Sequence, residues 1–499
     1  MFLRSVRQYV HQVLLSRRQN DEHMKAPLSP LKHSGYPTVQ LLLPASIHKR
    51  TAVYSESQLY MISLLAKKTL YSGDPPQSYH PLSIRILAKQ LGSKPRERHI
   101  EALITSGHIQ ILKNNTGKET YESGTRSKSY RLSPELADEI LRDELSAYYT
   151  PPESLLAKRL MKLRISLANE AIIEAPSLKR EYDWLQEITF NDEKAESFKH
   201  QFEQTGMRDD KVYSRAAAIR LESDLRALSN LQTGDFLFSY NDIRLETRVT
   251  SAMRQMRQCL EDSHGNAFVE LDMRSSQVVF LCKALVHYYS ESQDVTRTAD
   301  HLWKFFDKSV DLSNIEGILP TDVIAFINHV VYGDIYEELY MLATAYSEEW
   351  THQEPFTSVK TYVASSTQKM ITPRKDFKKA VMQEILFNYY TRSVNTPILA
   401  KAFNESYYHV TKFLEQLTEE STTKERSREL ARLVQKYEAH FFHFIALDLL
   451  EAQFPNRTFY VVHDSIGIPE DIVEDAQVLL NEAIAKHFGL PSDLGLIRH

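Results

Sequence analysis

The chain has little glycine and cysteine and no long apolar run. It contains 14 glycines in 499 residues, against a usual ~7%, which argues against glycine-rich nucleotide loops and favours a helix-rich chain. The two cysteines, Cys259 and Cys282, form neither a disulfide framework nor a four-ligand zinc site, so we expect a reducing, cytoplasmic compartment. No run of 18 apolar residues occurs, so we expect no transmembrane helix and no membrane partner.

Charge is distributed unevenly along the chain. The net charge of −5 is unfavourable for a nucleic-acid binder, but residues 1–135 hold 20 Lys+Arg against 9 Asp+Glu. The remainder, residues 136–499, holds 40 against 56. A basic module therefore precedes an acidic one, and such asymmetry hints at nucleic-acid contact by the basic part, although it also arises by chance. The length suggests two to four domains.

The N-terminal segment, residues 1–51, is predicted to be a basic helix followed by a linker. Its first 20 residues carry four arginines and no acid, with apolar residues at helical spacing. An organelle transit peptide is one interpretation, and a plain basic amphipathic helix is the favoured one. Residues 21–50 are rich in Pro, Ser and His, which is typical of a linker.

Residues 52–135 are predicted to form a small helix–turn–helix domain with a β-hairpin. Helices are expected near residues 59–65, at 80–92 ending at Gly92, and at 94–109 ending at Gly107. Two β-like runs, 109–113 and 128–133, flank a polar tip. This order resembles a winged helix, used either for nucleic-acid contact or as a protein-contact or spacer module. The candidate phosphate-contacting residues are Arg96, Arg98, Lys118, Arg126 and Lys128.

Residues 136–243 are predicted to be helical and highly charged, without a pattern that indicates chemistry. Residues 244–499 contain three more informative segments.

The first segment is a strand over residues 267–273, followed by an apolar helix. Glu270 and Asp272 share a face of this strand, because side chains alternate with period two. A carboxylate at a strand end beside a helix start is a rigid metal position. Taken alone, the pattern is more often an ordinary strand that meets a turn.

The second and third segments add cations and another carboxylate. In the helix expected from about Pro373, Arg374, Lys378 and Met382 fall at i, i+4 and i+8. This stripe suits a triphosphate held by two cations with a base on the apolar residue, although a solvated basic face is the commoner interpretation. Further along, a strand ending at Val462, a turn containing Asp464 and a return strand predict a hairpin that leads into a long amphipathic helix.

In this order, the three segments resemble the signature motifs of the family A polymerase superfamily. That superfamily includes DNA polymerase I-type enzymes and phage-type single-subunit RNA polymerases. The first motif matches at the run from Asp272 to Gln277, and the third at His463-Asp464-Ser465. The second matches in the spacing of its Arg, Lys and Met. The resemblance covers about residues 236–499 and leaves the first 135 residues outside.

The resemblance implies an α+β, mostly helical, right-hand fold. A small antiparallel palm sheet would be accompanied by helical fingers and thumb, with 136–243 as thumb or connecting region and 244–499 as palm and fingers. Two Mg²⁺ ions, with Mn²⁺ as a substitute, would be held by Asp272, Asp464 and the carbonyl of Met273. Lys378 and Arg374 would neutralise phosphate charge, with Lys378 also a proton donor to pyrophosphate.

Further contacts follow from the same resemblance. Nucleotide selection would involve Gln277, Met382 and Leu386. The basic segment 244–260 and the third motif would contact primer or template through Arg248, Arg254, Arg257 and His463. A helix over 430–452 would precede the third motif, with Gln435 and Glu438 on its polar side; ordinary surface charge is the alternative for Glu438 and Arg254.

The sequence departs from the family pattern at positions that bear on the product. Four residues after Met382 the family has Tyr, and this chain has Leu386. Where DNA polymerases place a Glu that blocks a 2′-hydroxyl, this chain has Gln277, of nearly the same size. Gln277 favours deoxynucleotides, whereas His463-Asp464-Ser465 and Met382 are closer to the RNA polymerases. The steric argument favours DNA.

The sequence therefore predicts a DNA-directed DNA polymerase of a mobile element, plasmid or phage, without a proofreading exonuclease because the remaining length leaves no room for one. We expect a monomer that binds a DNA primer-template, or RNA, and nucleoside triphosphates. The alternatives are a phage-type RNA polymerase and a non-enzymatic winged-helix replication initiator or regulator.

Overall fold

The computed structural model describes the chain from residue 38 to residue 498 with gaps. The described residues are 38–71, 75, 77–92, 94–114, 116–119, 128–151, 153–205, 207–208, 211–212, 215–229, 231, 237–240, 244–273, 275–290, 319–332, 334–345, 377–378, 381–382, 385, 398–417, 423–488 and 496–498. The helix expected in residues 1–20, and residues 21–37 of the linker expected up to residue 50, lie outside them. The rest of that segment is not a plain linker, because Gln40–Pro44 forms a strand and Ala45–His48 a short helix, and their apolar side chains Leu41, Leu42, Leu43 and Ile47 are buried in a core. The chain divides into an N-terminal unit (26–240 and 245–268) and a C-terminal unit (1–25, 241–244 and 269–499).

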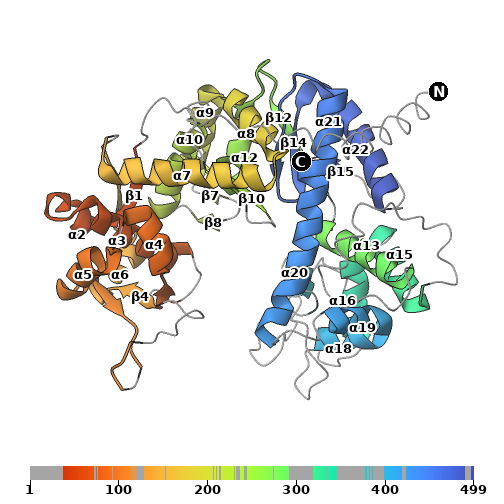
Figure 1. The fold of residues 1–499 in the computed structure, drawn as a ribbon, viewed down its shortest axis with the longest axis horizontal. Coiled ribbons are helices and arrows are strands. Elements are labelled where there is room, and N and C mark those ends of the chain that lie inside the picture. Colours follow the sequence, from red (N-terminus) through yellow and green to blue (C-terminus); the bar gives the residue numbers. More distant parts are fainter. Residues whose placement is uncertain are drawn as a thin grey trace. The chain divides into compact units, whose positions relative to one another are not determined.

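The described residues are mostly helical, with small antiparallel sheets, so the α+β class is confirmed (Figure 1). The predicted domain limits at 51, 135 and 243 stay a prediction.

In the first part of the N-terminal unit, the first and last strands pair in antiparallel fashion, and mostly helical elements lie between them in sequence. Its first elements are β1 (Gln40–Pro44), α2 (Ala45–His48), a 3₁₀ turn (Thr51–Val53), α3 (Glu56–Tyr71), β2 (His80–Pro81), α4 (Ile84–Leu91), a π-helical turn (Arg96–Ile100), α5 (Glu101–Thr105), β3 (Ile109–Ile111), β4 (Ser129–Leu132), α6 (Pro134–Leu141) and β5 (Leu145–Tyr149). β1 pairs with β5 over its whole length. One apolar core, which includes Leu43, Ile62, Leu103 and Tyr130, joins these elements.

The two helices and the paired strands predicted between residues 80 and 133 are confirmed, with shifted boundaries. The second helix, expected to end at Gly107, ends at Thr105, and its first turn over Arg96–Ile100 is π-helical. β2, β4 and β3 form a sheet in that order, and Ile109 lies opposite Leu132. Gly92 ends α4 with a left-handed φ of +92°, as its lack of a side chain allows. The first helix begins at Ile84 and not at residue 80, because His80 and Pro81 pair with β4 and Ser83 caps the helix.

The rest of the N-terminal unit is helical, with short strand pairs. Its elements are α7 (Leu155–Glu174), α8 (Leu178–Glu187), β6 (Thr189–Phe190), α9 (Asp192–Thr205), β7 (Met207–Arg208), β8 (Lys211–Val212), α10 (Arg215–Ser229), β9 (Phe238–Tyr240), β10 (Leu245–Thr247), α11 (Arg248–Ser251), α12 (Arg254–Arg257) and β11 (Leu260–Glu261). The strand pairs are β10–β9, β11–β6 and β7–β8.

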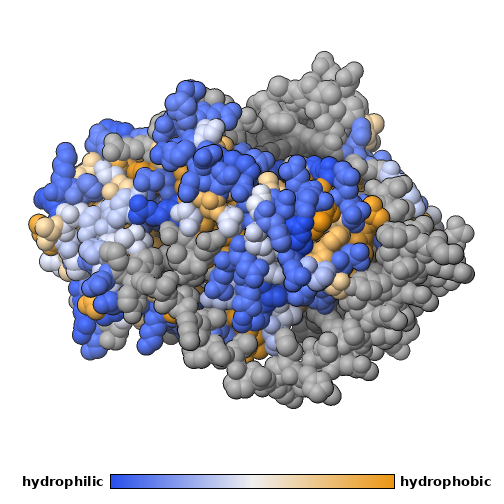
Figure 2. All heavy atoms as spheres, turned by 90° about the horizontal axis from the view of Figure 1, so that it is seen from above, coloured by the Kyte–Doolittle hydropathy of each residue, from blue (hydrophilic) through white to orange (hydrophobic). Residues whose placement is uncertain are grey.

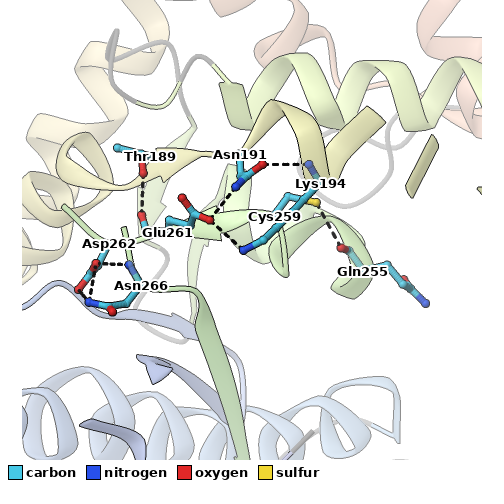
Figure 3. Close-up of polar contacts among 8 residues, drawn as sticks. All are labelled: Thr189, Asn191, Lys194, Gln255, Cys259, Glu261, Asp262 and Asn266. Atoms are coloured by element: carbon cyan, nitrogen blue, oxygen red, sulfur yellow. Dashed lines mark hydrogen bonds and ion pairs between the residues drawn. The ribbon is translucent and has the colours of Figure 1, made fainter. Parts of the chain in front are cut away.

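Side-chain hydrogen bonds hold the turn that leads out of this unit (Figure 3). The Asp262 carboxylate accepts the backbone N–H groups of His264 and Asn266 at 2.9 and 2.8 Å. The neighbouring Glu261 accepts hydrogen bonds from Asn191 and Lys194, both at 2.8 Å. These bonds fix the segment from which the chain continues directly into the next strand.

The C-terminal unit contains the predicted strand–helix and hairpin–helix segments. Its elements are β12 (Phe268–Met273, which begins at the boundary), α13 (Ser276–Ser290), α15 (Thr321–Val331), α16 (Ile335–Ala345), α18 (Ile398–Ser406), α19 (Tyr408–Leu417), α20 (Thr423–His440), a π-helical turn (Phe441–Ala446), α21 (Leu447–Gln453), β13 (Tyr460–Val462), β14 (Ser465–Pro469), a 3₁₀ turn (Glu470–Ile472), α22 (Val473–Phe488) and β15 (Leu496–Arg498). The four strands form one sheet in the order β13-β14-β12-β15.

Helix α13 is the centre of the described core of this unit. Its residues from Val278 to Val286 are all buried, and it packs against α15, α19 and α20. Such a buried surface needs helices on several sides, and the sequence indicated an apolar helix at this position. The packing of α13 thereby positions its start close to the end of β12.

The surface of the described residues is mainly hydrophilic on the face drawn in Figure 2, where apolar side chains occur in small groups. Exposed large apolar residues such as Val53, Ile86 and Tyr332 are an ordinary feature of soluble folds. Among the helices that the structure describes, none is long and apolar enough to cross a membrane.

Close packing in the hairpin leads to a stability prediction. Gly467 lies opposite Tyr460, and a β-carbon at Gly467 would overlap the tyrosine ring. We expect Gly467→Ala to lower the free energy of unfolding by about 1–3 kcal/mol, measured by urea denaturation, because overpacking displaces the ring. In a Tyr460→Val background the same change should have a much smaller effect. If Gly467→Ala lowers the free energy of unfolding equally in the wild type and in Tyr460→Val, overlap with the tyrosine ring is not the cause.

Candidate active site

Two aspartates from segments far apart in sequence lie on a strand and in a hairpin turn of one sheet in the C-terminal unit. Asp272 is on β12, one residue before its end, and Asp464 is in the two-residue turn between β13 and β14. The Met273 N–H donates a hydrogen bond of 2.9 Å to the Asp464 carbonyl. This bond joins the end of β12 to the hairpin turn and brings both carboxylates to the same end of the sheet.

Two residues in left-handed conformation shape the backbone around the aspartates. His463, the first residue of the hairpin turn, has a φ of +56°, as tight turns between antiparallel strands require. Ser275 has a φ of +53° and turns the chain from β12 into α13. Both are non-glycine residues in a conformation that carries strain, which is maintained by the surrounding packing.

A third carboxylate approaches the aspartates through a serine. The Ser276 hydroxyl lies 2.8 Å from Glu438 Oε1 and 3.1 Å from Asp464 Oδ2. Ser276 and Glu438 are each 2% exposed. Glu438, on α20, was expected on a polar helix face or as surface charge, but the structure buries it, because α20 packs against α13 at this point.

Burial changes the acidity of Glu438. Its pKa is raised to about 7, first by burial and then by the negative charge of Asp464, with a smaller contribution from Asp272. The hydrogen bond from Ser276 and the charge of Arg244, whose guanidinium lies 4.0 Å from Glu438, act in the opposite direction. The three carboxyl groups therefore interact electrostatically, which is typical of sites that handle protons or cations.

Tyr336 lies near both Asp464 and the predicted phosphate-binding lysine. Burial raises the pKa of Tyr336 to about 12; a hydrogen bond with Ser275 lowers it and the charge of Asp464 raises it further. The Lys378 ammonium lies 5.5 Å from the centre of the Tyr336 ring. Lys378 itself is exposed, so its charge faces solvent on the side of this tyrosine.

Apolar anchors hold the described part of the second motif. Phe377, Val381 and Ile385 are buried at i, i+4 and i+8, and Phe377 makes an edge contact with Tyr340 of α16. Lys378 and the half-buried Met382 follow these anchors by one residue. The other two predicted residues of this segment, Arg374 and Leu386, lie outside the described residues.

Gln277 is the second residue of α13 and is half-buried. Its amide oxygen is buried, and none of the described residues donates a hydrogen bond to it. A buried acceptor without a donor is unfavourable by about 1–3 kcal/mol, so such an atom in a native fold calls for a ligand or water. Met273, whose carbonyl is a predicted metal ligand, is buried at the end of β12.

The predicted basic contacts of segment 244–260 belong to the N-terminal unit. Arg248 and Arg254 are half-buried at the first positions of α11 and α12. Arg257 is 8% exposed and donates to the Ala252 carbonyl at 2.7 Å, which is a structural contact within its own segment.

The predicted contacts of segment 94–128 also belong to the N-terminal unit. Arg98 and Lys118 are exposed. Lys128 forms an ion pair with Glu119 across the hairpin, and its side chain is 11% exposed. Arg126 and the side chain of Arg96 lie outside the described residues.

The carboxylates fit a hard divalent cation bound together with a phosphate. Mg²⁺ typically takes one or two protein carboxylates and completes its coordination with water and substrate oxygens. Asp272 and Asp464 supply two such carboxylates. Within the described ranges, no group of three or more His, Cys, Asp or Glu residues is arranged to hold a metal on its own. An ion at this position would therefore complete its coordination with water and substrate oxygens.

Ser276, Glu438, Arg244 and Tyr336 were not predicted as site residues. Ser276 lies inside the first motif, but nothing in its spacing distinguishes it from a helix N-terminus. Glu438 follows the apolar Leu433, Val434 and Tyr437 on α20. Its position next to this apolar stripe was the one signal for burial.

No family model and no curated protein sequence matches this chain. Among solved structures, the chain is similar to the POL domain of Pol1 from M. smegmatis in complex with DNA primer-template and dNTP. The TM-score is 0.33 and the sequence identity 10%, over 89% of this chain and 84% of that chain.

The pKa of Glu438 predicts how stability depends on pH. An acid whose folded pKa is raised binds its proton more tightly in the native state, so stability is present at low pH and is lost as pH rises from about 4.5 to about 7. In EDTA, the free energy of unfolding should fall over this range by up to about 3 kcal/mol more in the wild type than in Glu438→Gln. The measurement is urea denaturation of both proteins at pH 5, 6, 7 and 8. If the free energy of unfolding changes with pH equally in the wild type and in Glu438→Gln, the raised pKa does not belong to Glu438.

Proposed function

We propose that this protein is a template-directed nucleic acid polymerase, with DNA as its product. The observation that carries the proposal is the meeting of Asp272 and Asp464. Two motifs that resemble the family A signatures, widely separated in sequence, supply one carboxylate each, and the Met273–Asp464 hydrogen bond joins them.

The side chains around the aspartates fit nucleotidyl transfer. Asp272 and Asp464 would hold two Mg²⁺ ions, which when bound stabilise the attacking and leaving oxygens of an in-line displacement. Lys378 is exposed beside Tyr336. There its positive charge can neutralise a triphosphate, and its ammonium group can donate a proton to the leaving pyrophosphate. Arg374, one helical turn earlier in the sequence, would bind the same triphosphate, and Met382 would support the base.

Gln277 supports deoxynucleotides as substrates. It follows Asp272 by five residues, lies half-buried at the start of α13, and has a side chain close in size to the Glu that excludes a 2′-hydroxyl in DNA polymerases. Its buried amide oxygen would then lie against the sugar of the incoming nucleotide.

The N-terminal unit would hold nucleic acid. The exposed Arg98 and Lys118 lie on the second helix and hairpin of a segment whose helices and three-stranded sheet follow the order of a winged helix. Arg248 and Arg254 begin short helices in the segment that precedes the first motif. Such cations position a phosphate backbone without reading its sequence.

Two alternatives make different predictions in one assay. A phage-type RNA polymerase would incorporate ribonucleotides without a primer. A non-enzymatic initiator would bind DNA through residues 52–135 and would not need Asp272 at all. A mismatched primer end included in the same assay tests the expectation that the protein does not excise it.

The two aspartates provide the main test. Primer extension with Mg²⁺ and deoxynucleotides should fall by more than about 100-fold in Asp272→Asn and in Asp464→Asn, since changes to the partners of metal ligands already cost 10–100-fold. The matched control is Asp475→Asn, an exposed acid on α22 of the same unit, which should extend primers as the wild type does. Full activity in either aspartate variant would refute the site.

Gln277 provides a test of the product. Gln277→Ala should raise ribonucleotide incorporation relative to deoxynucleotide incorporation by roughly 10–100-fold, because removal of the side chain makes room for a 2′-hydroxyl. The measurement is the ratio of kcat/KM for the two nucleotide sets. An unchanged ratio would show that another residue selects the sugar.

A further inference from the structure

The hydrogen bonds of Ser276 require one more proton than the serine carries. The hydroxyl has one hydrogen to donate, yet its oxygen lies within hydrogen-bond distance of two carboxyl oxygens, Glu438 Oε1 and Asp464 Oδ2. If both carboxyls were ionised, one contact would join a lone pair to a lone pair. Both contacts are satisfied when one carboxyl is neutral and donates to Ser276, which then donates to the other.

Burial indicates which carboxyl is neutral. Glu438 is 2% exposed, whereas Asp464 is half-buried in the hairpin turn. An ionised carboxylate loses more hydration the more deeply it is buried, so the neutral form belongs to Glu438. The chain of donors therefore runs from Glu438 to Ser276 to Asp464. Arg244 approaches the other oxygen of Glu438, Oε2, at 4.0 Å, which is the limit of an ion pair.

We propose that Ser276 and a neutral Glu438 are positioning residues, which orient the Asp464 carboxylate for a divalent cation through this chain of hydrogen bonds. The proposal rests on the proposed function, because it assigns these residues to the same metal site. It adds a buried acid that acts by donating a hydrogen bond and not by its charge. Ser276 engages Oδ2 of Asp464, and its position at the start of α13 is fixed by the buried residues that follow.

Metal affinity distinguishes a neutral donor from a third negative charge. If Glu438 acts as a neutral donor, Glu438→Gln keeps a donor of nearly the same shape and should bind Mn²⁺ within about twofold of the wild type. Glu438→Ala and Ser276→Ala break the chain and should weaken Mn²⁺ binding by about 10-fold, the range seen when partners of metal ligands are removed. If Glu438 acts by its charge, Glu438→Gln should weaken binding as much as Glu438→Ala does.

The experiment is a titration of the full chain with Mn²⁺ at pH 6, below the raised pKa of Glu438, in which free Mn²⁺ is measured by electron paramagnetic resonance. Thr411→Ala is the matched control, because Thr411 is also a buried hydroxyl of this unit and donates to Asn404 at 3.1 Å, outside the carboxylate cluster. It should lose stability without a change in Mn²⁺ affinity. Thermal unfolding of each variant shows whether weakened binding comes with loss of the fold.

The outcomes separate this inference from the proposed function. Retained affinity in Glu438→Gln with a loss in Ser276→Ala and Glu438→Ala supports the inference. Unchanged affinity in Ser276→Ala, with loss in Asp464→Asn, overturns the inference and leaves the polymerase proposal standing. If the wild type binds Mn²⁺ no better than Asp272→Asn and Asp464→Asn do, both fail together.

Discussion

The pairing of strand β12 with the β13–β14 hairpin determines the position of the candidate site, and the backbone hydrogen bond from the Met273 N–H to the Asp464 carbonyl extends this connection to the hairpin turn. The sheet holds the two chain segments in register, because β12 and β14 are hydrogen-bonded neighbours and Tyr460 of β13 donates a hydrogen bond to Glu270 of β12. Because α13 begins three residues after Met273, the same connection also sets where Ser276 meets Glu438 and Asp464.

Local patterns predicted the elements of the site, and tertiary packing decided its composition. The strand before Asp272, the turn at Asp464 and the helices that follow them were predictable, because alternation, turn residues and apolar periodicity are local signals. Glu438 was not predictable as a buried acid, because a charged residue on a helix is normally solvated. Its burial depends on α13, which is far away in sequence.

In the N-terminal unit, tertiary contacts also changed two sequence-based expectations, namely where a helix begins and how many cations are accessible. The helix expected from residue 80 begins at Ile84, because pairing of His80 and Pro81 with β4 overrides the helical pattern. The sequence count of cations also overstates those that can meet phosphate. Lys128 is paired with Glu119, and Arg257 folds back on the Ala252 carbonyl. Net charge is therefore a property of the segment, and accessible charge is a property of the fold.

The π-helical turn at Phe441–Ala446 determines how the side chains of α20 and α21 are rotated relative to each other around the helix axis. All six of its residues are buried, and it connects α20, which carries Glu438, to α21, which packs against α22. A wider turn contains one more residue than a regular one, and one residue corresponds to about 100° of rotation around a helix axis. In an uninterrupted α-helix of the same length, the apolar side of α21 and the carboxyl of Glu438 would be turned relative to each other by that angle. The π-helical turn thus lets one continuous helical segment direct the apolar side chains of α21 toward α22 and the carboxyl of Glu438 toward Ser276.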